Sequence, residues 1–362
     1  MKPSETLSVA RRDAAWRLLL EWYAREGRGH LPWRHTRDPY AILVSEVMLQ
    51  QTQVERVLPK YHVFLARFPT LAALAEAPAA EVIKAWAGLG YNSRAVRLWD
   101  IARQAISAYG GELPATLDGL LALKGIGRYT AGAVACFAFG LPVATVDTNI
   151  RRVLWRVIRG IEPVSWPSGQ RETRDALALA EAALPPDHAY DWQQALMDLG
   201  ATVCVSRRPA CERCPLTICC AAYAETARVT LFPSGEALAR LRDERAAADA
   251  SDAASQRVAE ARAGYATASG KPVRRARRPP AEPFTSSSRY FRGRVVEALR
   301  GLAPGEALTL AELGPRVKPA YAPDDLPWLR GVVAGLARDG LARVLPDNDG
   351  GESADDERVA LP

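Results

Sequence analysis

Apolar residues recur with helical spacing over about the first 225 residues of the chain. The segments LPKYHVFLARF (58–68) and LAALAEAPAAEVIKAWAGLG (71–90) place apolar residues three and four positions apart, which gives a helix one buried face. Gly88, Gly90 and Gly140 stand where such segments end. Strand-like alternation is scarce, so we expect residues from about 8 to 225 to be all-helical.

The pattern changes beyond this region. Residues 231–287 are charged and Ala-rich and end in the basic, Pro-rich stretch KPVRRARRPPAEP, which predicts a partly helical linker that ends in an extended tether. The tether can contact phosphates or simply be a solvated charge run. Helical patterns return within 288–362 and are followed by the short apolar runs LARVLP and ERVALP around a polar turn. Three helices and a terminal hairpin predict a small winged-helix-like module.

Composition adds modest constraints. The chain of 362 residues is long enough for two or three domains, and its formal net charge of +6 weakly favours an anionic partner. No secretory signal is visible. The longest uncharged run, Tyr129 to Val146, contains Gly132, Gly140 and Pro142, so we expect a buried helix and a loop rather than a membrane span. The protein is expected to be soluble and cytoplasmic, nucleoid-associated if bacterial, and monomeric.

Five of the six cysteines lie within residues 204–220, and such a cluster in an intracellular protein indicates metal. The spacing is Cys204-x6-Cys211-x2-Cys214-x5-Cys220. Four thiolates suit zinc or an iron–sulfur cluster, and one compact loop favours a single cubane over the separated pairs usual for zinc. Cys219 can replace Cys220 in this pattern, and Cys136 is expected to be core packing.

A glycine turn joins two helical patterns in LKGIGRYTAG (123–132). Gly125 and Gly127 would let backbone amides approach a phosphate, and the helix that follows, starting near Arg128, points its positive dipole end the same way. This is a helix–hairpin–helix signature for DNA backbone contact. The alternative is an ordinary helix–helix connection.

Two carboxylates stand out from their surroundings. Glu46 lies inside the apolar run ILVSEVML and ahead of three glutamines, and Asp147 follows an apolar run and precedes a helix. For an isolated Asp in that position the default role is an N-cap.

Together these stretches resemble the helix–hairpin–helix DNA glycosylase superfamily, and within it the MutY-type adenine DNA glycosylases. The matching stretches are LPWRHTRDPYAILVSEVMLQQTQVERVLPKY, GLGYNSRA, LKGIGRYTAGAVACFAFG, VDTNIRRV and ALMDLGATVCVSRRPACERCPL. The resemblance implies two helical subdomains with a [4Fe-4S] loop at 204–220, all within residues 1–230, and adenine excision from duplex DNA opposite 8-oxoguanine or guanine.

The resemblance also implies roles for individual residues. Glu46 would protonate N7 of adenine, which needs an acid whose pKa is raised by burial, and Asp147 would stabilise the oxocarbenium-like transition state. Tyr129 would hydrogen-bond near Asp147, and Asn149 would position Asp147 or water. Gln51 would contact the orphaned base, and Tyr91 would insert into the base stack. The adenine pocket would be lined by Trp33, Arg34, Leu49, Val54, Gln194 and Met197, with core packing as the alternative for the apolar three.

Other interpretations remain open. An endonuclease III-like bifunctional enzyme would carry Lys, as the Schiff-base nucleophile, where Tyr129 stands, and would lack the acid at Glu46. Two more interpretations are a thymine-mismatch glycosylase and a non-enzymatic iron–sulfur DNA-binding regulator. The chain departs from the MutY-type pattern at Asn92 (GYNSR for GYYSR) and at Thr148 (DTN for DGN). Many MutY-type enzymes also end in a larger β-rich domain that reads 8-oxoguanine, whereas residues 288–362 show a helical pattern here. The sequence therefore leaves the preferred opposite base undecided.

Overall fold

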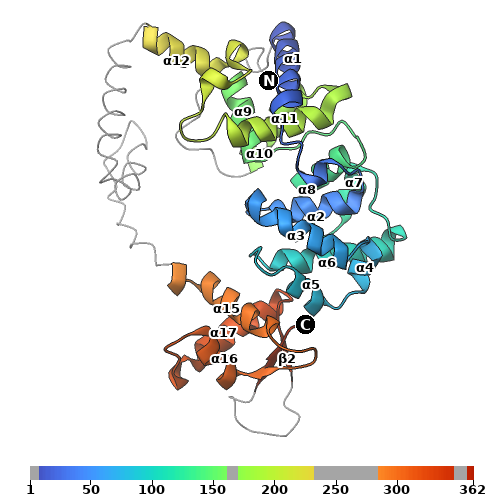
Figure 1. Cartoon of the computed structure of the whole chain (residues 1–362), viewed down its shortest axis with the longest axis vertical. Coiled ribbons are helices and arrows are strands. Elements are labelled where there is room, and N and C mark those ends of the chain that lie inside the picture. Colours follow the sequence, from blue (N-terminus) through green and yellow to red (C-terminus); the bar gives the residue numbers. More distant parts are fainter. Residues whose placement is uncertain (1–7, 161–169, 232–283, 346–356) are drawn as a thin grey trace.

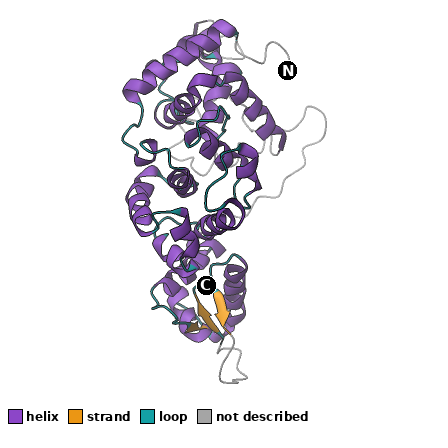
Figure 2. Cartoon of the chain, turned by 90° about the vertical axis from the view of Figure 1, so that its right-hand side faces the viewer, coloured by secondary structure: helices purple, strands orange, loops and turns teal. Residues whose placement is uncertain are grey.

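The computed structural model describes residues 8–160, 170–231, 284–345 and 357–362. The expected linker and the polar turn of the terminal hairpin lie almost entirely outside these residues. The described part is mainly helical, as Figures 1 and 2 show, and the prediction of a mainly helical fold is confirmed. We call residues 8–231 the body, and residues 284–345 with 357–362 the C-terminal module.

One half of the body forms around helix α2. Its helices α2 to α8 cover Pro39–Leu49, Val54–Arg67, Leu71–Glu76, Ala79–Ala85, Ser93–Tyr109, Leu117–Ala122 and Arg128–Phe137, after a 3-10 turn at Pro32–Arg34. The side chains of Asp38, Thr70 and Thr116 accept hydrogen bonds from the first backbone amides of α2, α4 and α7, which satisfies donors that a helix start leaves free. The core that these helices share includes Leu43 and Trp86, both fully buried.

The other half of the body combines the start of the chain with its later helices. Here α1, α9, α10, α11 and α12 cover Val9–Glu26, Thr148–Ile158, Gln170–Ala183, Ala189–Thr202 and Ala221–Leu231, with 3-10 turns at Pro186–His188, Cys211–Arg213 and Thr217–Cys219. Helix α1 packs on α11, and α9 packs on both α11 and α12. This half has its own core, which includes Leu19, Ile150 and Leu199. Glu46 therefore comes from one half of the body and Asp147 from the other.

The C-terminal module packs three helices against a small sheet. It contains α15, β1, α16, α17, β2 and β3, which cover Ser288–Arg300, Leu308–Thr309, Leu310–Val317, Leu326–Arg338, Arg343–Leu345 and Arg358–Ala360, with 3-10 turns at Phe284–Ser286 and Pro323–Asp325. The sheet order is β1-β3-β2, both pairs antiparallel, and Val359 pairs with Leu308 on one side and Val344 on the other. The pattern did not predict β1, which has two residues and ends at the residue whose side chain caps α16.

The module is docked on the body through α5, where Figure 1 shows α15 beside it. Ile83 of α5 is fully buried in the core of the module. Around it, the Ala80 amide donates to the Pro362 carbonyl at 3.1 Å and Lys84 Nζ to the Leu302 carbonyl at 3.1 Å. Arg300 Nε donates to the Ile83 carbonyl, also at 3.1 Å. The sequence pattern indicated a second unit but gave no sign of this interface.

Candidate active site

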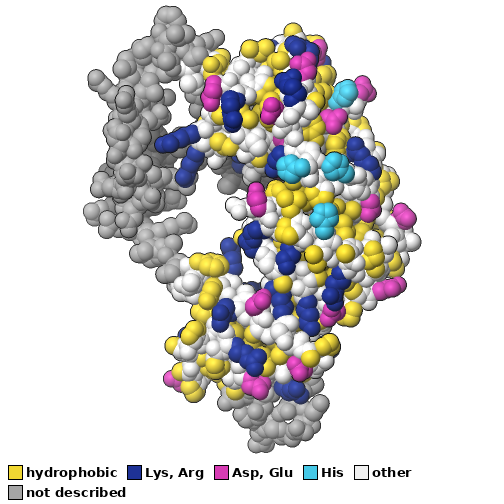
Figure 3. Space-filling view, viewed as in Figure 1, with side chains coloured by type: hydrophobic (Ala, Val, Ile, Leu, Met, Phe, Trp, Pro, Cys, Tyr) yellow, Lys and Arg dark blue, Asp and Glu magenta, His cyan; other side chains and the backbone are white. Residues whose placement is uncertain are grey.

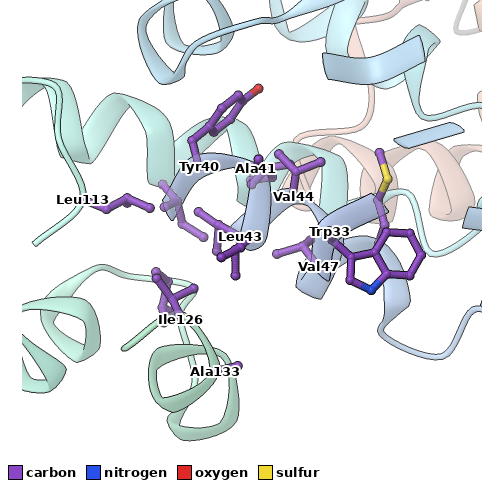
Figure 4. Close-up of a cluster of buried hydrophobic side chains, with 14 of the residues drawn as sticks. Trp33, Tyr40, Ala41, Leu43, Val44, Val47, Leu113, Ile126 and Ala133 are labelled. Atoms are coloured by element: carbon purple, nitrogen blue, oxygen red, sulfur yellow. The ribbon is translucent and has the colours of Figure 1, made fainter. Parts of the chain in front are cut away.

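Helix α2 encloses Glu46 in apolar surroundings. Every residue from Tyr40 to Met48 is buried, and the exposed fraction of Glu46 is 7%. Figure 4 shows Leu43 and Val47 of this helix among the buried apolar side chains, Leu43 toward Ile126 and Val47 beside Trp33. Inside a helix the backbone amides are already used, so Glu46 has no backbone donor to stabilise its charge.

The pKa of Glu46 is raised to about 7 from an ordinary value of 4.5, mainly by burial and to a smaller extent by the neighbouring charge of Asp147. A hydrogen bond from Tyr129 and the positive charge of Arg34 act in the opposite direction. The sum leaves a large fraction of Glu46 protonated near neutrality. This side chain can therefore deliver a proton to a bound group.

Tyr129 lies in the first turn of α8 and faces both carboxylates. Burial, then the nearby charges of Glu46 and Asp147, raise its pKa well above the ordinary value. We expected a hydrogen bond beside Asp147, whereas the structure gives Tyr129 its hydrogen bond with Glu46. A neutral phenol here orients Glu46 and offers no amine nucleophile.

Asp147 is the N-cap of α9. Its Oδ1 accepts from the Ile150 amide at 2.6 Å, and its Oδ2 accepts from Asn149 Nδ2 at 3.0 Å. Burial raises the pKa of Asp147, and these hydrogen bonds oppose the rise because they favour the carboxylate. The predicted N-cap geometry and the predicted Asn149 contact are therefore present together, in one side chain that also lies close to Glu46.

Arg152 extends this arrangement toward the cysteine loop. Its Nη2 donates to Asn149 Oδ1 at 2.8 Å and to the Gly200 carbonyl at 2.6 Å, and its Nε donates to the Cys204 carbonyl at 2.8 Å. Asn149 packs so closely on Gly200 that a Cβ at Gly200 would lie 2.6 Å from the Asn149 Cβ. Two of these partners, Gly200 and Cys204, are 48 and 52 residues away along the chain, so no local sequence pattern marks the contacts of Arg152.

The predicted pocket residues Trp33 and Arg34 lie in a buried network. Both terminal nitrogens of Arg34 donate to Asp198, at 2.6 and 2.7 Å, and Asp198 is fully buried. Trp33 packs edge-on against Tyr61 with ring centroids 5.4 Å apart. Arg34 is still close enough to lower the pKa of Glu46. Its two terminal nitrogens are committed to Asp198, whereas its Nε is buried and has no hydrogen-bond partner among the described residues. Its part in holding adenine remains a prediction.

The remaining predicted pocket residues are only partly exposed. Leu49, Val54 and Met197 pack against the core around α2, and Met197 also touches the core of the other half of the body. Gln194 on α11 is buried, with an exposed fraction of 6%. Core packing, the alternative for the apolar three, is thus at least part of their role.

The two predicted wedge residues share an unusual backbone. Gln51 has φ of 56° and Tyr91 has φ of 45°, in the left-handed region that costs a non-glycine residue about 1 kcal/mol or more. Both side chains are exposed. Strained, exposed side chains at adjoining turns are typical of a contact site.

Arg94 ties these two turns together, and sequence reasoning missed it. Its guanidinium is buried and donates to the carbonyls of Val47, Met48, Gln50, Leu89 and Gly90 at 2.6–3.2 Å, and to Thr52 Oγ1 at 2.9 Å. Burial lowers its pKa to about 10, so it remains charged. One signal was available: Arg94 precedes Leu98, Ile101 and Ala105 at helical spacing, on the apolar face of α6.

The glycine turn adopts the geometry that a backbone contact needs. Gly125 has φ of +103°, and a Cβ there would lie 2.7 Å from Arg97 Cγ. Gly127 is the N-cap of α8, and a Cβ there would meet nothing within 4 Å. Gln104 of α6 fixes the turn by bonds with the amide and carbonyl of Lys124, at 2.8 and 3.0 Å. Arg128 follows and forms a loose ion pair with Glu181, at 3.7 Å.

A groove of about 730 Å³ runs beside this turn and is larger than a hollow at residues 186–191. Arg97, Arg103 and Lys124 line it, together with Asp100 of α6 and Asp339 of the module. In Figure 3, basic side chains gather on the visible face at the level where the body meets the module. Both observations suit an anionic chain lying across this face.

The cysteine loop separates one cysteine from the other four. Burial raises the pKa of Cys211, Cys214 and Cys220, and each is raised further by neighbouring loop thiols, Cys204 among them. Cys219 instead points into the core, where its Sγ donates to the Leu216 carbonyl at 3.3 Å. The geometry thus groups Cys220, not Cys219, with the other three. Cys136 is buried at a distance from them, and its Sγ accepts from Gln193 Nε2 at 2.9 Å.

These four thiols are a donor set that zinc or an iron–sulfur cluster takes. A cubane takes one thiolate at each of its four irons. Arg156 Nη1, 3.4 Å from Cys204 Sγ, supplies a positive charge beside the thiolates that such a cluster requires.

Comparison with known proteins gives a consistent result. Residues 44–173 match the family described as HhH-GPD superfamily base excision DNA repair protein. The chain is 48% identical over 203 residues to an adenine DNA glycosylase of Mycolicibacterium smegmatis. The aligned region covers 56% of this chain and 67% of that protein. The chain is 44% identical over 226 residues to the adenine DNA glycosylase of Homo sapiens, covering 60% of this chain and 41% of that one.

A solved structure of a thermostable thymine-DNA glycosylase is also similar. The two share 34% sequence identity with a TM-score of 0.55, over 60% of this chain and 98% of that one. The chain therefore spans between two fifths and two thirds of these two adenine glycosylases, and nearly all of the thymine-DNA glycosylase. No described helix of the chain is both long and apolar enough to cross a membrane.

Proposed function

Because the chain belongs to the HhH-GPD superfamily of base excision DNA repair proteins, we propose that it is a monofunctional adenine DNA glycosylase. It would hydrolyse the N-glycosidic bond of adenine mispaired with 8-oxoguanine or guanine in duplex DNA. The proposal includes the division into a glycosylase domain (1–230), a linker (231–287) and a winged-helix-like module (288–362). The protein would act as a monomer on chromosomal DNA in the cytoplasm.

The observation that carries this proposal is Glu46, a buried acid whose pKa is about 7, placed beside Asp147. Adenine is a poor leaving group as an anion, so its departure needs protonation of the ring, for which N7 is accessible. Glu46 would supply that proton. Asp147, held as a carboxylate by Ile150 and Asn149, would stabilise the positive charge that develops at C1′ until water adds there.

The residues around this pair would handle the DNA. Gln51 and Tyr91 would enter the space left in the stack when adenine is extruded, a step that costs a few kcal/mol. Gly125, Gly127 and Arg128 would bind the backbone through amides and charge. Trp33, Arg34, Leu49, Val54, Gln194 and Met197 would surround the adenine. Cys204, Cys211, Cys214 and Cys220 would hold a [4Fe-4S] cluster that, when bound, stabilises the loop folded beside α9.

The direct test is adenine release under single-turnover conditions from A:8-oxoG, A:G, A:C and T:G duplexes in parallel. We expect release from the first two. Thymine release from T:G, with no adenine release, would favour the activity named for the similar solved structure. The purified protein should also show the brown colour of an iron–sulfur cluster, and stoichiometric zinc without iron would overturn that assignment.

The rival bifunctional chemistry has a separate test. A lyase forms a Schiff base that borohydride reduces to a stable protein–DNA adduct. Tyr129 occupies the nucleophile position and cannot form one, so trapping should remain at background while adenine is released. Trapping at the rate of base release would instead establish lyase activity.

A further inference from the structure

The contacts of the module with the body converge on one loop. Besides docking on α5, the module reaches residues 91 and 92, next to the strained turn that Arg94 holds. Arg300 Nη2 donates to Asn92 Oδ1 at 2.9 Å, and the Arg300 side chain is only 9% exposed. Asn92 is one of the two positions where the catalytic region departs from the MutY-type pattern. The departure thus provides the acceptor that the module uses.

The second contact reaches the predicted wedge itself. Arg289, at the start of α15, lies with its guanidinium carbon 5.3 Å from the centre of the Tyr91 ring. Its Nη1 is 3.4 Å from Tyr91 Oη. Arg94 approaches the same ring at 5.6 Å, so Tyr91 lies within reach of one guanidinium from each part of the protein. A guanidinium over an aromatic face contributes about 0.5–2 kcal/mol, depending on its exposure.

The module cannot move freely relative to this contact. Ile83 is buried in the core of the module, and the Ala80 amide and Lys84 Nζ are both hydrogen-bonded to module carbonyls. A rigid mount matters because a side chain fixes its neighbour only if its own backbone is fixed. Arg289 is therefore presented to Tyr91 by a docked surface rather than by a tether.

We propose that the C-terminal module takes part in recognising the damaged base pair, with Arg289 as a positioning residue that holds Tyr91 ready to enter the base stack. This inference rests on the proposed function, and it gives the module a role in DNA recognition. The chemistry recognised is the exposed face of a base beside the extruded nucleotide. Tyr91 stacks on that face, and Arg289 restricts the orientations that the ring adopts beforehand.

A double-mutant cycle tests this inference. The variants are Arg289→Ala, Tyr91→Ala and the two combined, and the readouts are duplex affinity by fluorescence anisotropy and single-turnover adenine release. We expect each single variant to weaken binding to an A:8-oxoG duplex about three- to tenfold. The double variant should be no worse than Tyr91→Ala, because Arg289 acts through that ring. Arg289→Lys should recover part of the loss.

Arg294→Ala is the matched control. It removes the same charge from the same helix, but Arg294 donates to the Arg316 carbonyl within the module, so affinity should stay within about twofold of wild type. Additive losses in the double variant, or wild-type affinity for Arg289→Ala, would overturn the inference. The slope of the logarithm of duplex affinity against the logarithm of salt concentration gives a further check. If Arg289→Ala reduces that slope by about 0.9 both with Tyr91 and with Ala at position 91, Arg289 contacts a phosphate directly and the inference is overturned.

The binding measurements also separate this inference from the proposed function. They need no base release, so the coupling between Arg289 and Tyr91 can be measured even on a protein that excises nothing. If the wild type releases no adenine from any duplex, the proposed activity fails while the cycle still decides the role of Arg289. If adenine is released and the cycle is additive, only the role of Arg289 fails.

Discussion

The middle of α2 and the first turn of α9 carry the same kind of side chain in opposite electrostatic settings. Glu46 sits where every backbone amide is used within the helix, so no backbone donor stabilises its charge, and burial is the main cause that raises its pKa to about 7. Asp147 sits where the helix start leaves amides free, and it accepts one of them together with the Asn149 side chain. Position along a helix thus decides whether backbone donors oppose the effect of burial on a carboxyl group, as they do at Asp147 but not at Glu46.

Glu46→Gln should produce the largest loss. The amide keeps the shape of the side chain but has no proton to give, and general acid catalysis contributes about 10²–10⁴-fold. Single-turnover adenine release should fall by that range while duplex affinity stays near that of wild type. Release at a near-wild-type rate would remove Glu46 from the acid role and end the contrast between the two positions.

Asp147→Asn should follow, with a loss of about 10²–10³-fold, the range for removing one group that stabilises transition-state charge. The variant sharpens the comparison because the charge of Asp147 helps to raise the pKa of Glu46. The remaining activity should therefore decline at a lower pH than in the wild type. An unshifted pH profile would show that the two groups do not interact.

Stability should respond to pH through Glu46. Its pKa in the folded protein is about 7 against an ordinary 4.5, so the folded state holds a proton that the unfolded state has lost between these values. The free energy of unfolding then falls as pH rises through this window, by about 3 kcal/mol at 1.36 kcal/mol per unit. Glu46→Gln should restore that amount at pH 8 and nothing at pH 4. Denaturant titrations that show equal effects at both pH values would contradict the assigned pKa.

Asn149→Ala should have the smallest effect on excision, about tenfold. It removes the side-chain hydrogen bond of Asn149 to Asp147 and one acceptor for Arg152, yet the backbone amides of Ile150 and residue 149 still hold the carboxylate. The matched comparison is Thr148→Gly, which restores the commoner DGN sequence without touching either hydrogen bond and should leave the rate within a few fold. A loss as large as that of Asp147→Asn would mean that Asn149 contacts substrate itself.

Features encoded in neighbouring residues could be predicted from the sequence. Helical periodicity, the glycine turn and the Asp147 cap are local, and each has its expected geometry. The choice between Cys219 and Cys220 could not be made, because spacing does not say which way a side chain points, whereas the core around Leu216 does. That Glu46 is the partner of Tyr129 could not be predicted for a similar reason: α2 and α8 pack together at a point that no local pattern marks.

The least predictable residues were three arginines with distant partners. Arg94, Arg152 and Arg289 reach hydrogen-bond acceptors 47, 52 and 198 residues away along the chain. No local sequence pattern marks these contacts. An arginine with several donors is suited to binding carbonyls from separate segments, and only the fold brings those carbonyls together. Strand β1 escaped detection because two residues are too few for a periodic signal.

The burial of Ile83 in the core of the module has a consequence for folding during synthesis. Helix α5 leaves the ribosome early, but the residues that cover Ile83 run from Val295 to Val359. At about 5–20 residues per second, this apolar side chain waits on the order of tens of seconds for its cover. During that interval the nascent body exposes an apolar surface at Ile83 that chaperones and other chains can bind. Expression at low temperature, or truncation before the module, should therefore change the yield of soluble protein more than it changes the rate of base release per folded molecule.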